Sequence, residues 1–167
     1  MSLLPTMLER IARARVDLRM GLPVILTTGD TAILAIAVES LSAARLADLR
    51  DLGLVSLALT ARRAATLKAR VYDEDIARIT VPTDVELGWI KAIADPADDL
   101  QTPMKGPLTS ARSGDATLPR LAIALVKSAR LLPATVYVAL ENAGDFALKH
   151  DLTLLPQSAA EPLLNKS

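Results

Sequence analysis

The sequence predicts one layered domain of the α/β (α+β) class, in which short apolar strands alternate with helices. The chain has 167 residues, a length that suits one domain, so we expect residues 1–167 to form one unit. Hydrophobic residues make up 51% of the chain, which is enough for a sizeable core. Apolar runs typical of strands alternate with segments whose apolar residues recur at helical spacing. Together these observations favour a sheet covered by helices.

The first half of the chain contains strand and helix signals in alternation. Ser42 and Thr60 each stand directly before a helical pattern, where a hydroxyl side chain caps free backbone N–H groups. Gly29-Asp30 is a turn signal between two apolar runs. We expect helices at about 5–21, 42–52 and 61–67, and strands at about 23–28, 31–38 and 54–59.

The second half continues the alternation after a less regular stretch. Asp84 is the expected cap of a helix that runs to about Ala94. Residues 95–117 are rich in Pro, Gly, Asp and Ser, which predicts a long surface loop. The strongest helical pattern follows at 118–132 and is expected to be mostly buried. Strands are expected at 77–81, 135–140 and 151–155, with a short helical turn at 146–149 and a tail helix after the last strand.

Composition excludes several classes of function. The chain has no cysteine, so thiolate nucleophiles, disulfides and cysteine zinc sites are absent from it. Its formal net charge is zero, so we expect no nucleic-acid partner. The longest apolar runs, 32–38 and 121–126, are too short to cross a bilayer, and the N-terminus lacks a signal-peptide pattern. We therefore expect a cytoplasmic protein without a membrane partner.

No motif for metal, nucleophilic or cofactor chemistry stands out. His150 is the only histidine and is interpreted as a cap or loop residue. The acidic group Asp95, Asp98 and Asp99 has the ligand chemistry for Mg²⁺, but an Asp-Pro turn exposed to solvent explains it more simply. The run 73–75 is likewise interpreted as a solvated charged loop. We predict no catalytic residue, no metal ligand and no cofactor.

Weak signals for binding an anion lie at the start of one predicted helix. Arg62 and Arg63 open that helix after Thr60, and arginines in this position complement a phosphate or simply keep the surface soluble. If a phosphorylated sugar or nucleotide binds, Thr60, Arg62 and Arg63 are the candidates for its phosphate. Asp30 or Glu39 is then the candidate for a sugar hydroxyl.

An ordered set of segments resembles a known family, 3,4-dihydroxy-2-butanone 4-phosphate synthase, the riboflavin-pathway enzyme that acts on ribulose 5-phosphate. The resemblance covers nearly the whole chain and implies a mixed sheet flanked by helices and a homodimer. The segments that carry it are Gly21–Leu26, Ala35–Glu39 with Ser42, Gly53–Thr60 with Arg63, Ile90–Pro96, Ala129–Ala134 and Phe146–Leu152.

The chain departs from this family at the positions that matter for catalysis. The family's acidic catalytic loop follows the first strand, and here that place holds only Thr27–Thr31. The family's metal-binding histidine corresponds to Leu118, and the glutamate two residues later to Arg120. The family's Asp-Arg pair falls on 85–86, which here is Val-Glu. The resemblance therefore implies that the catalytic loop and metal site are lost.

Residues 124–134 resemble the N-terminal part of certain bacterial GTP cyclohydrolase II proteins, in which the synthase domain has degenerated. This implies a non-catalytic domain that works with a GTP cyclohydrolase II domain in cis or in trans. The cyclohydrolase zinc site needs three cysteines, so that chemistry is outside these residues. Two alternatives stay open: a binding module for a phosphorylated sugar or nucleotide in the remnant pocket, and an unrelated enzyme that uses Asp30, Glu39 or the 95–99 cluster.

Overall fold

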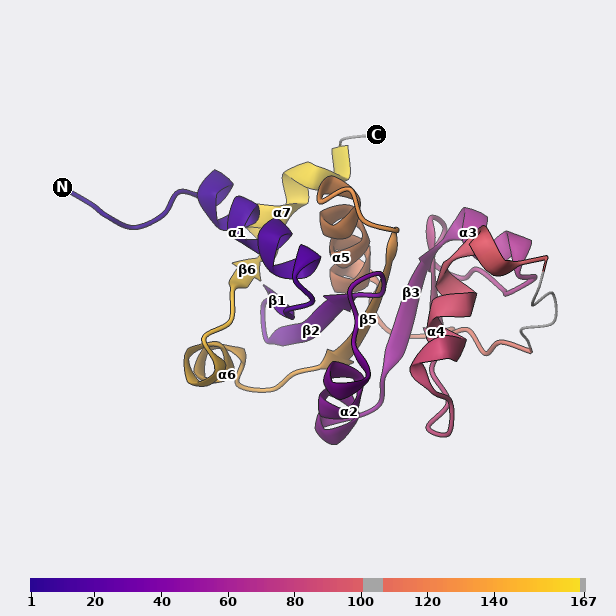
Figure 1. Ribbon diagram of the computed structural model, residues 1–167. Helices are drawn as coiled ribbons and strands as arrows, with labels where there is room; N and C mark the ends of the chain where they lie inside the picture. The colour runs from indigo at the N-terminus through magenta and orange to yellow at the C-terminus, as the bar shows by residue number, and fades with distance from the viewer. Residues whose placement is uncertain (101–106, 166–167) are drawn as a thin grey trace.

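The structure, a computed structural model, describes residues 1–100 and 107–165 and is built on a mixed β-sheet (Figure 1). Within these residues the sheet has six strands in the order β4-β3-β5-β2-β1-β6. β1 and β6 are parallel, and every other neighbouring pair is antiparallel. The mixed sheet confirms the predicted fold class. The strands are β1 Val24–Thr28, β2 Thr31–Ala37, β3 Ser56–Thr60, β4 Ile76–Thr80, β5 Ala134–Ala139 and β6 Leu154–Pro156.

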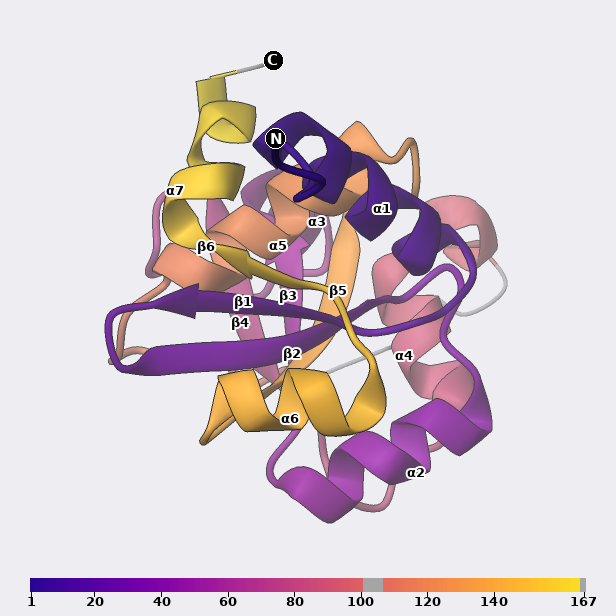
Figure 2. The ribbon, with the colours of Figure 1, turned by 90° about the vertical axis from the view of Figure 1, so that its left-hand side faces the viewer.

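Helices cover both faces of the sheet, so the apolar residues form two clusters, one on each side. Neighbouring residues of β3 show the alternation: Leu57 and Leu59 belong to one cluster, and Ala58 belongs to the other. Figure 2 shows α1, α5 and α7 on one side of the strands and α2 and α6 on the opposite side. The helices are α1 Met7–Arg19, α2 Ala43–Leu52, α3 Ala61–Thr66, α4 Leu87–Ala94, α5 Thr117–Ser128, α6 Ala143–His150 and α7 Gln157–Ala160, with short 3₁₀ segments at Pro96–Asp98 and Glu161–Asn165.

The two N-caps predicted in the first half, Ser42 and Thr60, are confirmed, and Thr6 adds a third cap that was not predicted. Thr6 forms a reciprocal capping box with Glu9: the Glu9 N–H donates to Thr6 Oγ1 at 3.1 Å, and the Thr6 N–H donates to Glu9 Oε1 at 2.8 Å. Ser42 and Thr60 cap α2 and α3 in the same way, by accepting from the backbone N–H three residues later. These hydrogen bonds are local in sequence, so the pattern of residues is enough to predict them.

Three predicted boundaries are wrong. α4 begins at Leu87 after Glu86, and Asp84 does not cap it. α5 ends at Ser128, four residues early, because Arg130 takes a left-handed conformation with φ 61° and Leu131 N–H closes back onto the Val126 carbonyl. The predicted turn at 146–149 is part of the eight-residue helix α6.

Part of the predicted surface loop 95–117 pairs with the sheet, and residues 101–106 lie outside the described part. Thr80 N–H donates to the Thr109 carbonyl at 2.9 Å, and Ala111 N–H donates to the Arg78 carbonyl at 2.7 Å. The loop therefore satisfies backbone groups along the outer edge of β4, which would otherwise stay open for pairing. Among the described residues, no helix combines the length and the apolar character that a membrane span requires.

Candidate functional site

The β1–β2 connection, where the resemblance places the family's acidic catalytic loop, is a tight hairpin. Thr28 pairs directly with Thr31, which leaves only Gly29 and Asp30 in the turn. Gly29 has φ +54°, and a glycine at the first turn position is typical of two-residue hairpins. Asp30 is exposed at the tip of this hairpin. The connection has no room for an extended loop that reaches over a substrate.

The first turn of α5 holds the two positions that the sequence resemblance assigns to metal ligands of the family. Leu118 is 3% exposed and packs in the apolar cluster on the α5 side of the sheet. Arg120 Nε donates to both carboxylate oxygens of Asp75, at 2.8 and 3.1 Å. Its Nη2 also donates to the Asp73 carbonyl at 3.0 Å. This turn is therefore occupied by packing and by an ion pair.

The run Asp73–Asp75 is a solvated charged loop at Glu74 and Asp75, which are exposed, but not at Asp73. Asp73 accepts from Arg78 Nε at 2.8 Å, and both side chains are largely buried, with exposures of 11% and 8%. This carboxylate raises the pKa of the Arg78 guanidinium, an effect that burial partly offsets. Arg78 Nη2 also donates to the Ser113 carbonyl at 2.9 Å, which fixes the segment before α5. The run thus anchors the chain around α5.

The acidic cluster after α4 has a structural role for two of its members. Asp95 accepts from the Ala97 N–H at 2.9 Å and caps the 3₁₀ segment, as an Asp-Pro turn does. Asp99 forms an ion pair with Arg63 at 2.6 Å, so the simple reading of a solvated turn is wrong for this residue. The Asp98 side chain lies outside the described part of the structure.

The five candidate binding residues do not converge on one point. Arg63 is tied to Asp99 and donates further to the carbonyls of Ile93, at 2.8 Å, and Ala92, at 3.2 Å. Asp30 and Glu39 lie beyond opposite ends of the seven-residue strand β2. At roughly 3.3 Å per residue this strand separates the two side chains by more than about 20 Å. Glu39 accepts from the Leu132 N–H at 2.9 Å.

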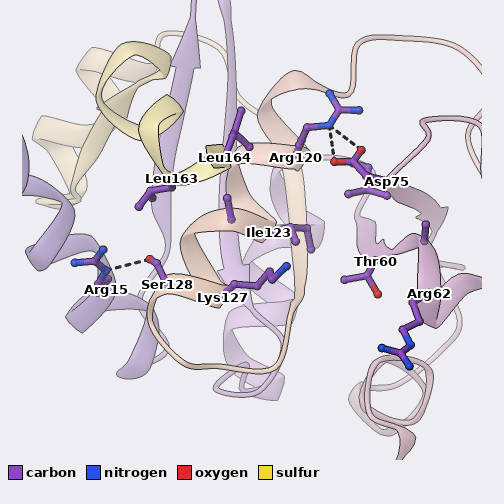
Figure 3. A pocket seen from close by; sticks show the side chains of 13 residues that line it. Arg15, Thr60, Arg62, Asp75, Arg120, Ile123, Lys127, Ser128, Leu163 and Leu164 are labelled. Carbon is purple, nitrogen blue, oxygen red and sulfur yellow. Dashed lines mark hydrogen bonds and ion pairs between the residues drawn. The ribbon is translucent and has the colours of Figure 1, made fainter. Parts of the chain in front are cut away.

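Thr60 and Arg62 do line one open groove, with a volume of about 760 Å³, between α5 and the β3–α3 junction. Figure 3 shows Lys127 and Ile123 of α5 on one side of this groove, and Thr60 and Arg62 on the other. Sequence reasoning missed Arg15, Arg120 and Lys127 as members of this group, because α1 and α5 lie far from Thr60 and Arg62 along the chain. The binding role proposed for Thr60, Arg62, Arg63, Asp30 and Glu39 stays a prediction.

Among the described residues, no group of three or more His, Asp and Glu side chains is placed to hold a metal ion. His150 is the last residue of α6 and is exposed, with its ring 4.3 Å from that of Phe146. Its position is that of the cap or loop histidine predicted from the sequence.

Comparison with known proteins finds a related sequence and solved structures of the same fold. No protein-family model matches the sequence. The sequence is 30% identical over 156 residues to a GTP cyclohydrolase-2 from Azospirillum brasilense. This match covers 89% of the chain but only 40% of that relative, so the chain spans less than half the length of the relative it matches.

Solved structures of 3,4-dihydroxy-2-butanone 4-phosphate synthases have the same fold. A two-domain synthase from A. baumannii superposes with a TM-score of 0.67 at 18% identity and covers 90% of this chain and 56% of its own. The synthase from Candida albicans gives a TM-score of 0.67 at 16% identity, with 93% and 97% covered. A synthase in complex with two magnesium ions gives 0.66 at 15% identity, with 94% and 97% covered.

The protein is therefore a synthase-like domain: it has the 3,4-dihydroxy-2-butanone 4-phosphate synthase fold. Its sequence is related to part of a GTP cyclohydrolase-2, which confirms the resemblance found from the sequence. The two residues that the sequence resemblance assigns to the metal site do not suit magnesium. Leu118 has no ligand atom, and Arg120 brings a positive charge that is already paired with Asp75.

Proposed function

We propose that this chain is a non-catalytic synthase-like domain of a riboflavin-pathway protein, and that its synthase site has been lost. The observation that carries the proposal is the first turn of α5. A buried leucine and a paired arginine stand there at the positions that correspond to the family's metal ligands.

The neighbouring elements support the same conclusion. The β1–β2 hairpin closes with Gly29 and Asp30 alone, where the family carries an acidic loop. At the remaining family position, 85–86, the chain has Val-Glu, and the Val85 carbonyl accepts from Arg50 Nη2 at 2.6 Å. At the first turn of α5, the cationic side chain of Arg120 opposes the binding of Mg²⁺ by charge repulsion. On this proposal, three separate parts of the expected site are replaced by packing, by an ion pair and by backbone contacts.

The proposal includes a GTP cyclohydrolase II domain as partner, in cis or in trans, and a homodimer, both expected from the family. Leu4, in the segment before α1, and Leu8, in its first turn, are 82% and 79% exposed and offer apolar surface for such a contact. Light scattering after gel filtration measures the dimer directly, and Leu8→Arg should weaken the association if this surface forms it.

The direct test of the lost site is a turnover assay with ribulose 5-phosphate and Mg²⁺, with an active synthase as positive control. We expect no product above the rate without protein. The double variant Leu118→His/Arg120→Glu should also be inactive, because the hairpin still lacks the acidic loop. It should be less stable, because it buries a polar ring and removes the ion pair to Asp75.

Measurable turnover by the native chain, dependent on Mg²⁺ and absent after heat unfolding, would overturn the proposal. Turnover by the double variant alone would show that the hairpin is compatible with catalysis, and would restrict the loss to the two ligand positions.

A further inference from the structure

The groove between α5 and the β3–α3 junction concentrates positive charge in a chain whose formal net charge is zero. Its lining includes four cationic side chains and a single carboxylate, that of Asp75. The cations come from three different helices: Arg15 from α1, Arg62 from α3, and Arg120 and Lys127 from α5. The fold therefore gathers these charges from distant parts of the sequence.

Two of the four cations are already engaged. Arg120 is paired with Asp75, and Arg15 Nε donates to Ser128 Oγ at 3.0 Å. Among residues 1–100 and 107–165, no hydrogen bond or ion pair engages the charged ends of Arg62 and Lys127. Figure 3 shows Lys127 extending across the groove toward the side that carries Thr60 and Arg62. The two cations without a partner thus belong to opposite walls of the same groove.

The floor of the groove is apolar. Ile76 of β4 and Ile123 of α5 are 2% and 5% exposed, and Leu163 of the C-terminal 3₁₀ segment is 6% exposed. Ala124 completes this surface beside Lys127. An apolar floor under a cationic rim suits a molecule that has an anionic group at one end and a flat or apolar body at the other.

We propose that this groove binds an organic phosphate of the nucleoside monophosphate type. The phosphate lies between Lys127 and Arg62, which donate charge-assisted hydrogen bonds from both sides. The base lies on Ile76, Ile123 and Leu163. The volume of about 760 Å³ is within the usual range for small-ligand sites. This binding requires no turnover, so it is independent of whether the synthase site is lost.

The site differs from the remnant pocket considered from the sequence. Arg63 takes no part in it, because its guanidinium is bound to Asp99 and to the end of α4. Asp30 and Glu39 are not among the lining residues. Thr60 takes part through its position in the wall, while its hydroxyl accepts from the Arg63 N–H at 3.1 Å.

The test is isothermal titration calorimetry of the 167-residue chain at low ionic strength, with guanosine 5′-monophosphate, guanosine and inorganic phosphate as probes. The nucleotide should bind at least about tenfold more tightly than either fragment, because only it uses both the cations and the floor. Its affinity should fall as salt is added, since the two cations are exposed.

Exposed residues provide clean variants. Lys127→Ala and Arg62→Ala should each weaken nucleotide binding by about tenfold without unfolding the chain. Lys149→Ala is the matched control, because Lys149 is an exposed cation on α6, on the opposite face of the sheet. The proposal would be overturned if Lys127→Ala and Arg62→Ala bound the nucleotide as strongly as Lys149→Ala. It would also be overturned if the native chain gave no heat of binding with the nucleotide at millimolar concentration. Equal affinity for the nucleotide and for phosphate would refute the role of the apolar floor.

Discussion

Two adjacent arginines, Arg62 and Arg63, should contribute very differently to stability. The Arg63 side chain is 9% exposed and donates to both carboxylate oxygens of Asp99, at 2.6 and 2.9 Å. It also donates to three carbonyls at the end of α4: those of Ile93, Ala92 and Asp95. Arg62 is exposed, and none of the interactions described engages its guanidinium. Arg62 and Arg63 therefore allow a comparison of an exposed and a buried arginine within one turn of α3.

The size of the Arg63 effect follows from these contacts. Breaking a buried ion pair from one side costs about 3–5 kcal/mol. Asp99 is 30% exposed, so water recovers part of this cost. The loss of the α4 carbonyl contacts adds to the cost, because the positive charge of Arg63 at the C-terminus of α4 also interacts favourably with the helix dipole. We expect Arg63→Ala to lower the free energy of unfolding by about 3 kcal/mol, and Arg62→Ala to change it by less than about 0.5 kcal/mol.

Urea unfolding followed by tryptophan fluorescence measures both variants, since Trp89 is the only tryptophan and lies in α4. Arg63→Lys should give an intermediate loss, because lysine keeps the charge but lacks the planar fork that reaches both Asp99 oxygens. A loss below about 1 kcal/mol for Arg63→Ala would refute the reasoning. So would an equal loss for Arg62→Ala, because the contacts would then not explain the difference.

Two further predictions concern the backbone and the response to alkali. Gly21 has φ +83°, and a Cβ there would lie 2.6 Å from the Ser40 carbonyl oxygen, so Gly21→Ala should lower the free energy of unfolding by about 2 kcal/mol or more. Gly144 lies in α6 with open space around it. Gly144→Ala should therefore raise the free energy of unfolding by about 0.5 kcal/mol in the same urea assay. Burial raises the pKa of Tyr137 to about 12, although Arg78 acts in the opposite direction. Because the unfolded phenol ionises near pH 10, the neutral Tyr137 contributes its full share of stability below about pH 10. That share is lost as pH rises toward 12, in total about 3 kcal/mol. Tyr137→Phe should flatten this alkaline loss, and an unchanged slope in unfolding experiments between pH 9 and 12 would contradict the assignment.

The sequence was most informative where the physics is local. The capping residues Ser42 and Thr60 act on N–H groups within three positions, so the residue pattern alone predicts them. The end of α5 shows the limit of this approach. The apolar pattern continues through Leu131 and Leu132, but Arg130 turns left-handed, and a residue other than Gly in that conformation leaves little trace in the sequence.

The candidate site depended on pairings that sequence cannot reveal. Arg63 and Asp99 are 36 positions apart, and Arg120 and Asp75 are 45 apart. Each residue read alone is an ordinary surface charge, and only the strand order brings the partners together. The groove has the same origin, since its cations lie on α1, α3 and α5.

If the synthase site is lost, as we propose, the first turn of α5 explains how the fold can persist without that chemistry. Metal ligands at the start of a buried helix are polar groups that must be held away from better packing, and such sites commonly reduce stability. Here Leu118 adds apolar contact to the core, and Arg120 links α5 to the segment before β4. The exposed Arg120–Asp75 pair is worth at most about 1 kcal/mol by itself, so the gain in stability comes mainly from Leu118. Restoring a metal site at these positions would require the loss of the apolar contacts of Leu118. We therefore expect the domain to be retained for its surfaces and its groove.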